Sequence, residues 1–162
     1  MNSQRVLLTT ADGDFTAVLT ERGLAGLDFP RRSRTPPAPI ESLPPQPRKW
    51  AQMTAKALNR ALAGQNVAAL PPLDESEATD FQRTVWQALR AIPAGSTRSY
   101  AEIAASVGRP RAFRAVGQAC GANPIPVLTP CHRAVAAGGG LGGFSGGLEW
   151  KQRLLERERQ AA

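Results

Sequence analysis

The chain has 162 residues, 42% of them hydrophobic, and a net charge of +7 at pH 7. This length fits one medium-sized domain or two small ones, and two cysteines with one histidine are too few for a disulfide framework or a structural zinc site. No run of about 18 apolar residues predicts a membrane span, and the start, MNSQRVLLTTADGDF, lacks the features of a signal peptide. We therefore expect a cytoplasmic protein with no metal and no membrane contact.

The first 72 residues predict a small α/β domain. Residues 5–29 read as strands separated by turns at Asp12-Gly13 and Arg22-Gly23. Seven of the fourteen prolines fall in residues 30–47, which predicts a linker or long surface loop and excludes a helix or a central strand there. Residues 48–64 then predict a helix with apolar positions on one side, ending at Gly64.

Residues 73–162 predict a second, mostly helical domain, so that the fold class is α+β. Thr79 and Ser99 are placed to cap two helices, and Glu102 can act as the reciprocal partner of Ser99. Residues 99–123 then predict two short helices joined by the turn GRPR, which is typical of a helix-turn-helix. The second of these helices is rich in alanine and glycine, which suits close approach to a groove better than burial in a core.

Positive charge is concentrated in the middle of the chain. Residues 81–133 hold seven arginines, no lysine and one acidic residue, Glu102, and so carry six of the seven net positive charges. A basic composition alone would fit a solvated surface equally well. Its concentration in one third of the chain favours a polyanionic partner whose phosphates the arginines neutralise.

The only histidine, His132, follows one of the two cysteines, Cys131. Neighbouring side chains of an extended segment point to opposite faces, so the pair predicts a contact through water and not a direct one. A free thiol, with a pKa of about 8.5, needs a base to become a nucleophile. Proton withdrawal would run from Cys131 through water to His132, with Glu158 orienting the other ring nitrogen. A buried, structural Cys131 is the alternative at this point.

Four stretches of the sequence resemble the O6-alkylguanine-DNA alkyltransferases, also called methylated-DNA–protein-cysteine methyltransferases. They are FQRTVWQAL, IPAGSTRSYAEIA, RAVGQACGANP and PCHRAV, the last followed by GGFSGGLEWKQRLLERE. The similarity covers residues 79–158, whereas the N-terminal third matches only in its layout of strands. The resemblance implies an RNase H-like N-terminal domain and a winged-helix-like C-terminal domain.

The resemblance also implies roles for individual residues. Cys131 would be the acceptor thiolate, activated by His132 and Glu158, and Tyr100 would give a proton to the leaving guanine. Asn123 would bridge the recognition helix to the active-site turn, and Arg114 would be the finger that fills the space left by an extruded base. The implied DNA contacts come from Arg98, Arg111, Arg114, Ala115, Gly117 and Arg133. The implied contacts to the flipped base come from Tyr100, Phe144, Ser145 and Gly146.

The activity that the resemblance implies is direct reversal of DNA damage. The alkyl group of O6-alkylguanine in duplex DNA would pass, after base flipping, irreversibly to Cys131, once per molecule and without a cofactor. The protein would be a monomer in solution, with possible clustering on DNA. Three positions depart from the family pattern, where a small residue, valine and tyrosine are usual: Phe113, Ala134 and Phe144.

Two other classes of protein stay open on the sequence alone. The chain could be a non-catalytic helix-turn-helix protein that senses lesions or regulates, although such relatives typically lack the cysteine. It could also be a Cys-His hydrolase, but adjacent residues linked through water do not form the usual direct dyad. Alkyl transfer is the interpretation that accounts for the most residues.

Overall fold

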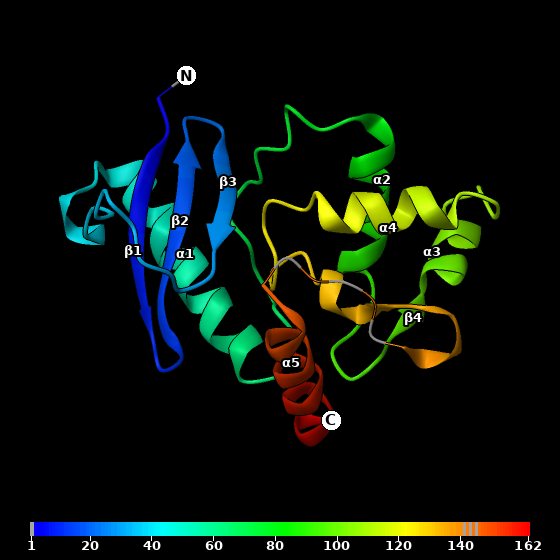
Figure 1. The fold of residues 1–162 in the computed structure, drawn as a ribbon. Helices are drawn as coiled ribbons and strands as arrows, with labels where there is room; N and C mark the ends of the chain where they lie inside the picture. The colour runs from blue at the N-terminus through cyan, green and yellow to red at the C-terminus, as the bar shows by residue number, and fades with distance from the viewer. Residues whose placement is uncertain (1, 141, 143, 145) are drawn as a thin grey trace.

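The computed structural model describes residues 2–140, 142, 144 and 146–162, and these form a mixed α and β structure. The N-terminal part is an antiparallel sheet of β1 (Gln4–Thr10), β2 (Gly13–Thr20) and β3 (Gly23–Asp28), in the order β1-β2-β3. Both strand turns lie where the sequence predicts them. Figure 1 shows the helix α1 behind this sheet and the helices α2 to α5 beyond the edge formed by β3.

The helix α1 (Pro45–Leu62) begins inside the proline-rich segment. The prediction that residues 30–47 contain no helix is therefore wrong at its end, and a 3-10 turn, η1 (Ile40–Ser42), also lies there. Proline is tolerated in the first turn of a helix because the N–H group it lacks has no partner within the helix at that position. The helix ends before Gly64, which has a left-handed φ of +80° and lies so close to Arg157 O that a Cβ there would be 2.4 Å away.

The C-terminal part contains α2 (Asp80–Arg90), α3 (Tyr100–Ser106), α4 (Phe113–Gly121) and α5 (Leu148–Ala161). The predicted caps are confirmed: Thr79 exchanges hydrogen bonds with Gln82, and Ser99 with Glu102, as two complete capping boxes. Two short strands, β4 (Arg98–Ser99) and β5 (Ala134–Val135), pair in parallel. Two 3-10 turns, η2 (Cys131–Arg133) and η3 (Ala137–Gly139), flank β5.

Two hydrophobic clusters fill the interior. One joins the sheet and α1 to Ile125, Val127, Leu128 and Leu154 from the C-terminal part, and the other lies among α2, α3 and α4 and includes Cys131. The division into domains at residues 72 and 73 stays a prediction, since residues beyond it complete the first cluster. None of the described helices is long and apolar enough to cross a membrane.

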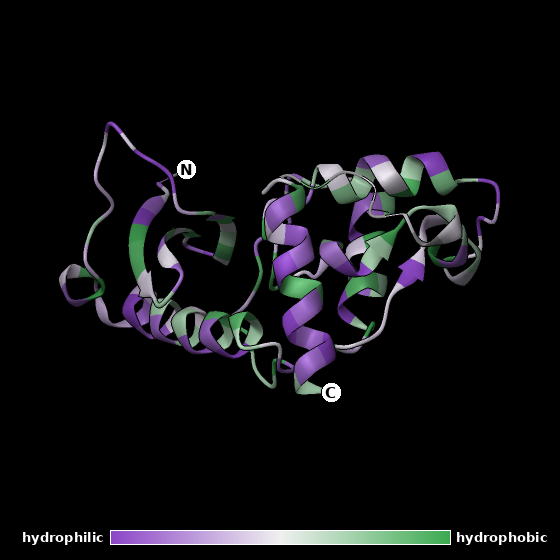
Figure 2. Cartoon of the chain, turned by 60° about the horizontal axis from the view of Figure 1, so that its bottom comes forward, coloured by the Kyte–Doolittle hydropathy of each residue, from purple (hydrophilic) through white to green (hydrophobic). Residues whose placement is uncertain are grey.

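The last helix, α5, lies between the sheet and the helical part (Figure 1). Most of its surface is hydrophilic, as the colours of Figure 2 show. Its buried residues are Lys151, Leu154 and Glu158, which recur on one face at the spacing of three and four residues. Two of these three are charged, so α5 brings ionisable groups, and not mainly apolar ones, into the interior.

Candidate active site

Cys131 follows a tightly hydrogen-bonded turn that begins at Asn123. The side-chain amide of Asn123 donates to Thr129 O at 2.8 Å, and its carbonyl accepts from Ile125 N at 3.0 Å. Cys131 N also donates to Thr129 O, at 2.8 Å. Val127, inside this turn, has a φ of +73°, a strained conformation for a β-branched residue, so the hydrogen bonds must outweigh a local cost.

The residues Cys131 and His132 lie in the 3-10 turn η2, so the extended segment assumed from the sequence is wrong. Successive side chains of a 3-10 turn are about 120° apart, because it has three residues per turn. The two side chains therefore still diverge. Both are buried, with 4% of Cys131 and 1% of His132 exposed.

His132 contacts Glu158, which reaches it from α5. His132 Nε2 lies 2.5 Å from Glu158 Oε1, and Arg133 Nε donates to both carboxylate oxygens of Glu158, at 3.1 and 3.0 Å. Burial alone would raise the pKa of Glu158, but the bonds from His132 and Arg133 outweigh burial and hold this pKa below its ordinary value. Glu158 is therefore ionised and can only accept hydrogen bonds.

The ionised Glu158 fixes the tautomer of His132. Burial lowers the pKa of His132, so the ring is neutral, and its single proton lies on Nε2, where Glu158 accepts it. The other nitrogen, Nδ1, is then an acceptor, and it is buried with no hydrogen-bond partner within the described part of the chain. His132 thus presents one basic nitrogen inside the site.

Lys151 is a charged residue of this site that sequence reasoning missed. It is fully buried, and its Nζ donates to Ala134 O at 2.7 Å. Burial lowers its pKa, whereas the nearby thiols of Cys131 and Cys120 act in the opposite direction. The signal was available in the sequence, because Lys151 stands seven residues before Glu158 and so on the same helical face.

The two cysteines differ in their surroundings. Burial raises the pKa of Cys131, and a hydrogen bond from Asn123 and the charge of Lys151 partly oppose it. Burial raises the pKa of Cys120 to about 12. Cys131 is therefore a protonated thiol at rest, and it has next to it the groups that would stabilise its thiolate.

Tyr100 is brought near Cys131 by the short pairing of β4 with β5. Arg98 pairs with Ala134 and Ser99 with Val135, so the start of α3 lies against the segment that leaves η2. The hydroxyl of Tyr100 would lie 2.6 Å from a Cβ at Gly142, whose left-handed φ of +68° favours glycine. Burial raises the pKa of Tyr100, which keeps the phenol protonated and able to donate.

The loop before α5 supplies one wall of the site. The ring of Phe144 meets that of His132 edge-on, with centroids 6.4 Å apart, and it packs against both hydrophobic clusters. Gly146 lies against Phe29 of the N-terminal part. The predicted contact of Ser145 lies outside the described residues.

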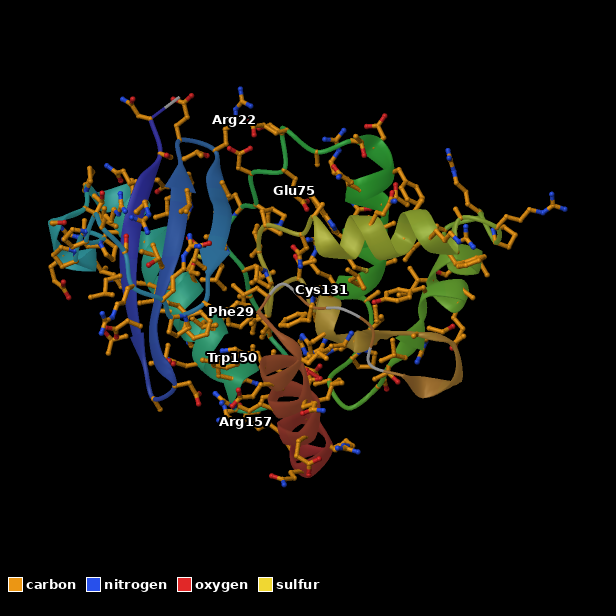
Figure 3. All side chains as sticks on the ribbon, viewed as in Figure 1. Arg22, Phe29, Glu75, Cys131, Trp150 and Arg157 are labelled. Carbon is orange, nitrogen blue, oxygen red and sulfur yellow. The ribbon has the colours of Figure 1, made fainter. Side chains whose placement is uncertain are left out.

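The loop before Cys131 has a second support. Arg90 of α2 donates to Thr129 Oγ1 at 2.8 Å and forms an ion pair with Glu75 at 3.2 Å. Glu75 belongs to the segment that connects the two parts of the chain (Figure 3). Arg90 therefore binds groups of the protein itself, Thr129 and Glu75.

The seven arginines of residues 81–133 do not form one surface. Arg83 donates to Glu75 O and Ala78 O and pairs with Asp80, Arg90 pairs with Glu75, and Arg133 is buried against Glu158 and Ile92 O. Arg133 is therefore no longer assigned to the DNA contacts. The four exposed members are Arg98, Arg109, Arg111 and Arg114.

Three of these exposed arginines surround the start of α4. Arg109 and Arg111 precede this helix, and Arg114 lies in its first turn. Ala115 and Gly117 follow on the same helix, and a Cβ at Gly117 would meet nothing within 4 Å. No packing contact among the described residues therefore requires glycine at this position.

Known proteins match the chain over both parts. The family model described as 6-O-methylguanine DNA methyltransferase, DNA binding domain, matches residues 80–160. A methylated-DNA–protein-cysteine methyltransferase of Methanosarcina barkeri is 40% identical over 141 residues, which are 85% of each chain. Its namesake in Mycobacterium tuberculosis is 50% identical over 105 residues, 65% of this chain and 63% of that one.

Solved structures agree with these sequence matches. The crystal structure of Mycobacterium tuberculosis OGT in complex with DNA superposes with a TM-score of 0.76 at 37% identity, covering 98% of this chain and 94% of that one. The O6-methylguanine methyltransferase of the same organism gives a TM-score of 0.74 at 34% identity over 99% and 95% of the two chains. On these matches the chain belongs to the methylated-DNA–protein-cysteine methyltransferase family.

Proposed function

We propose that this chain repairs O6-alkylguanine in duplex DNA by one irreversible transfer of the alkyl group to Cys131. The observation that carries the proposal is the buried contact of His132 Nε2 with Glu158, next to Cys131 in the chain, which leaves His132 Nδ1 as a basic acceptor. The nucleophile must remain a thiol, which fits the reducing cytoplasm. No cofactor enters the reaction.

The thiol of Cys131 is activated as it attacks. Its proton passes through a water molecule to His132 Nδ1, and Glu158 stabilises the imidazolium that forms. The charge of Lys151 favours the thiolate as well, because its positive charge acts to lower the pKa of Cys131. The buried thiol can thus ionise although burial raises its pKa.

The leaving group needs a proton because guanine departs poorly as an anion. As the bond from Cys131 Sγ to the alkyl carbon forms, the bond from that carbon to O6 breaks and its electrons pass to the guanine. The phenol of Tyr100, kept protonated by its raised pKa, gives its proton to a ring nitrogen. Tyr100 regains a proton through water from the imidazolium of His132, so the proton lost by Cys131 balances the one that guanine gains. The product is a thioether that none of the groups described in the site can cleave, so each molecule would react once.

The helices α3 and α4 form the helix-turn-helix of a winged-helix-like domain in this proposal, with α4 against the DNA. The open position Gly117 supports this assignment, because glycine weakens the interior of a helix by about 1 kcal/mol and Gly117 has no neighbour within 4 Å that would explain it. A partner from outside the chain would explain it. We also propose that the sheet and α1 form the RNase H-like domain that the family resemblance implies.

Binding to undamaged duplex should depend steeply on salt. With up to four phosphate contacts, from Arg98, Arg109, Arg111 and Arg114, log K should fall against log salt with a slope of about −3 to −4. Arg111→Ala should reduce the slope by about one, whereas Arg83→Ala should leave it unchanged because Arg83 is engaged within the chain. Titrations at several salt concentrations measure both, and a flat response would exclude these arginines from the DNA surface.

Intact-mass measurement tests the transfer itself. After incubation with a duplex that contains one O6-methylguanine, the protein should gain one methyl group, and peptide mapping should place it on Cys131. Cys131→Ser should gain none, and Cys120→Ser, the matched control, should gain one. Tight binding of the lesion with no gain in mass would instead support the non-catalytic sensor.

A further inference from the structure

Phe29, the first residue after β3, touches the loop that precedes α5. Its ring centroid lies 5.7 Å from that of Phe144 and 5.1 Å from that of Trp150. A Cβ added to Gly146 would lie 2.5 Å from Cε2 of Phe29. The φ of Gly146 is not in the left-handed region, so the ring of Phe29, and not the backbone conformation, excludes a side chain at this position.

The ring of Phe29 is itself held in place from behind. Phe15, which is fully buried on β2, lies 5.5 Å from it, and Phe15 and Phe29 both contact Trp150 of α5. Figure 3 shows Phe29 and Trp150 together between the sheet and α5. Protein interiors are closely packed, so Phe29 cannot retreat without displacing these rings.

The other side of the loop faces the reactive centre. Phe144, two residues before Gly146, lies against His132, next to Cys131 in the chain. A shift of the loop away from Phe29 would carry the wall formed by Phe144 toward His132, and a shift toward Phe29 would enlarge the space. The thickness of one ring in the N-terminal part thus sets the position of a wall in the C-terminal part.

We propose that Phe29 is a positioning residue that sets the size of the alkyl group the site accepts. The inference rests on the proposed function, since it concerns the same loop and the same Cys131. It also gives the N-terminal part a task in the reaction. A smaller residue at 29 lets the loop move back and admits larger groups, whereas a larger residue at 146 pushes the loop inward and excludes them.

The test compares two duplexes that carry either O6-methylguanine or O6-benzylguanine. The measured quantity is the ratio of the benzyl to the methyl transfer rate on one protein sample, so that any unfolded fraction cancels. Phe29→Leu should raise this ratio by about tenfold and Gly146→Ala should lower it by a similar factor, the size typical of small changes in a pocket. The double variant should return to within about twofold of the wild type, because the added methyl group then occupies the space freed at 29.

Leu58→Ala is the matched control. Leu58 is a fully buried residue of α1 in the same cluster, so the substitution lowers stability, and it should leave the ratio unchanged because Leu58 is not one of the rings that hold Phe29 in place. Gly146→Ala removes no core contact and tests the same contact should Phe29→Leu fold poorly. An unchanged ratio in Gly146→Ala, or an equal shift in Leu58→Ala, overturns the inference. Wild-type protein that gains no alkyl group from either duplex overturns the proposed function instead.

Discussion

Arg114→Ala should slow methyl transfer from duplex DNA by about 30- to 100-fold, with little effect on transfer from free O6-benzylguanine. Extruding a nucleotide costs a few kcal/mol of stacking and pairing, and about 1.4 kcal/mol corresponds to a factor of ten in rate. Arg114 is exposed in the first turn of α4, with its guanidinium 5.9 Å from the ring of Phe113, which is 45% exposed. A cation there can enter the stack and stabilise the flipped state, whereas a free base needs no flipping.

Rates at saturating duplex separate this role from a phosphate contact. If Arg114 only binds a phosphate, the rate of Arg114→Ala should recover once all protein is bound, as it should for Arg111→Ala, the matched control. A loss that persists at saturation supports the finger. Equal slowing on duplex and on free base would contradict both roles and point to a disturbed active site.

Glu158→Gln should lower the free energy of unfolding by about 3–5 kcal/mol, because breaking a buried ion pair leaves one charge unpaired. Glu158 is 2% exposed, and the buried guanidinium of Arg133 would keep Ile92 O and the neutral amide oxygen of glutamine as acceptors but lose its counter-charge. Transfer should slow as well, since glutamine cannot stabilise an imidazolium as a carboxylate does. Glu156→Gln, on the exposed side of the same helix, is the matched control and should change neither stability nor rate.

The stability difference between wild type and Glu158→Gln should depend on pH in one direction. The pKa of Glu158 in the folded protein lies below its ordinary value of 4.5, so its contribution is fully present above that value and is lost as the pH falls through the folded pKa. Denaturant titrations at neutral and acid pH measure this. A difference that stays constant into the acid range would mean that the carboxylate of Glu158 is not what stabilises the fold.

Features that depend on neighbouring residues were predictable from the sequence. Thr79 and Ser99 cap their helices because a capping box needs only residues three positions apart. The start of α1 was predicted three residues too late, since the prolines were read only as breakers and not as residues that suit a first turn. Local sequence therefore predicted which helices form. It missed the start of α1 because proline can either break a helix or begin one.

Contacts between distant parts of the chain were not predictable from pattern. Nothing in the sequence distinguishes the buried Arg133 from the exposed Arg111, because burial depends on how α5 packs against η2. The contact of Phe29 with Gly146 likewise joins residues far apart in the chain. Lys151 was predictable in part. Its spacing from Glu158 places both on one face of a helix, but a lysine is seldom expected in a protein interior.

The two hydrophobic clusters show that the catalytic half of the chain is not a portable module. Residues 80–160 carry every proposed catalytic side chain, yet Ile125, Val127, Leu128 and Leu154 complete a core that belongs to the sheet and α1. Arg157, which Figure 3 labels on α5, forms a bidentate ion pair with Asp12. The two distances are 2.7 and 2.9 Å, and Asp12 lies in the turn between β1 and β2. A fragment cut to those residues would expose an apolar face and leave α5 without its ion pair to Asp12, so a shortened form of this chain should lose stability.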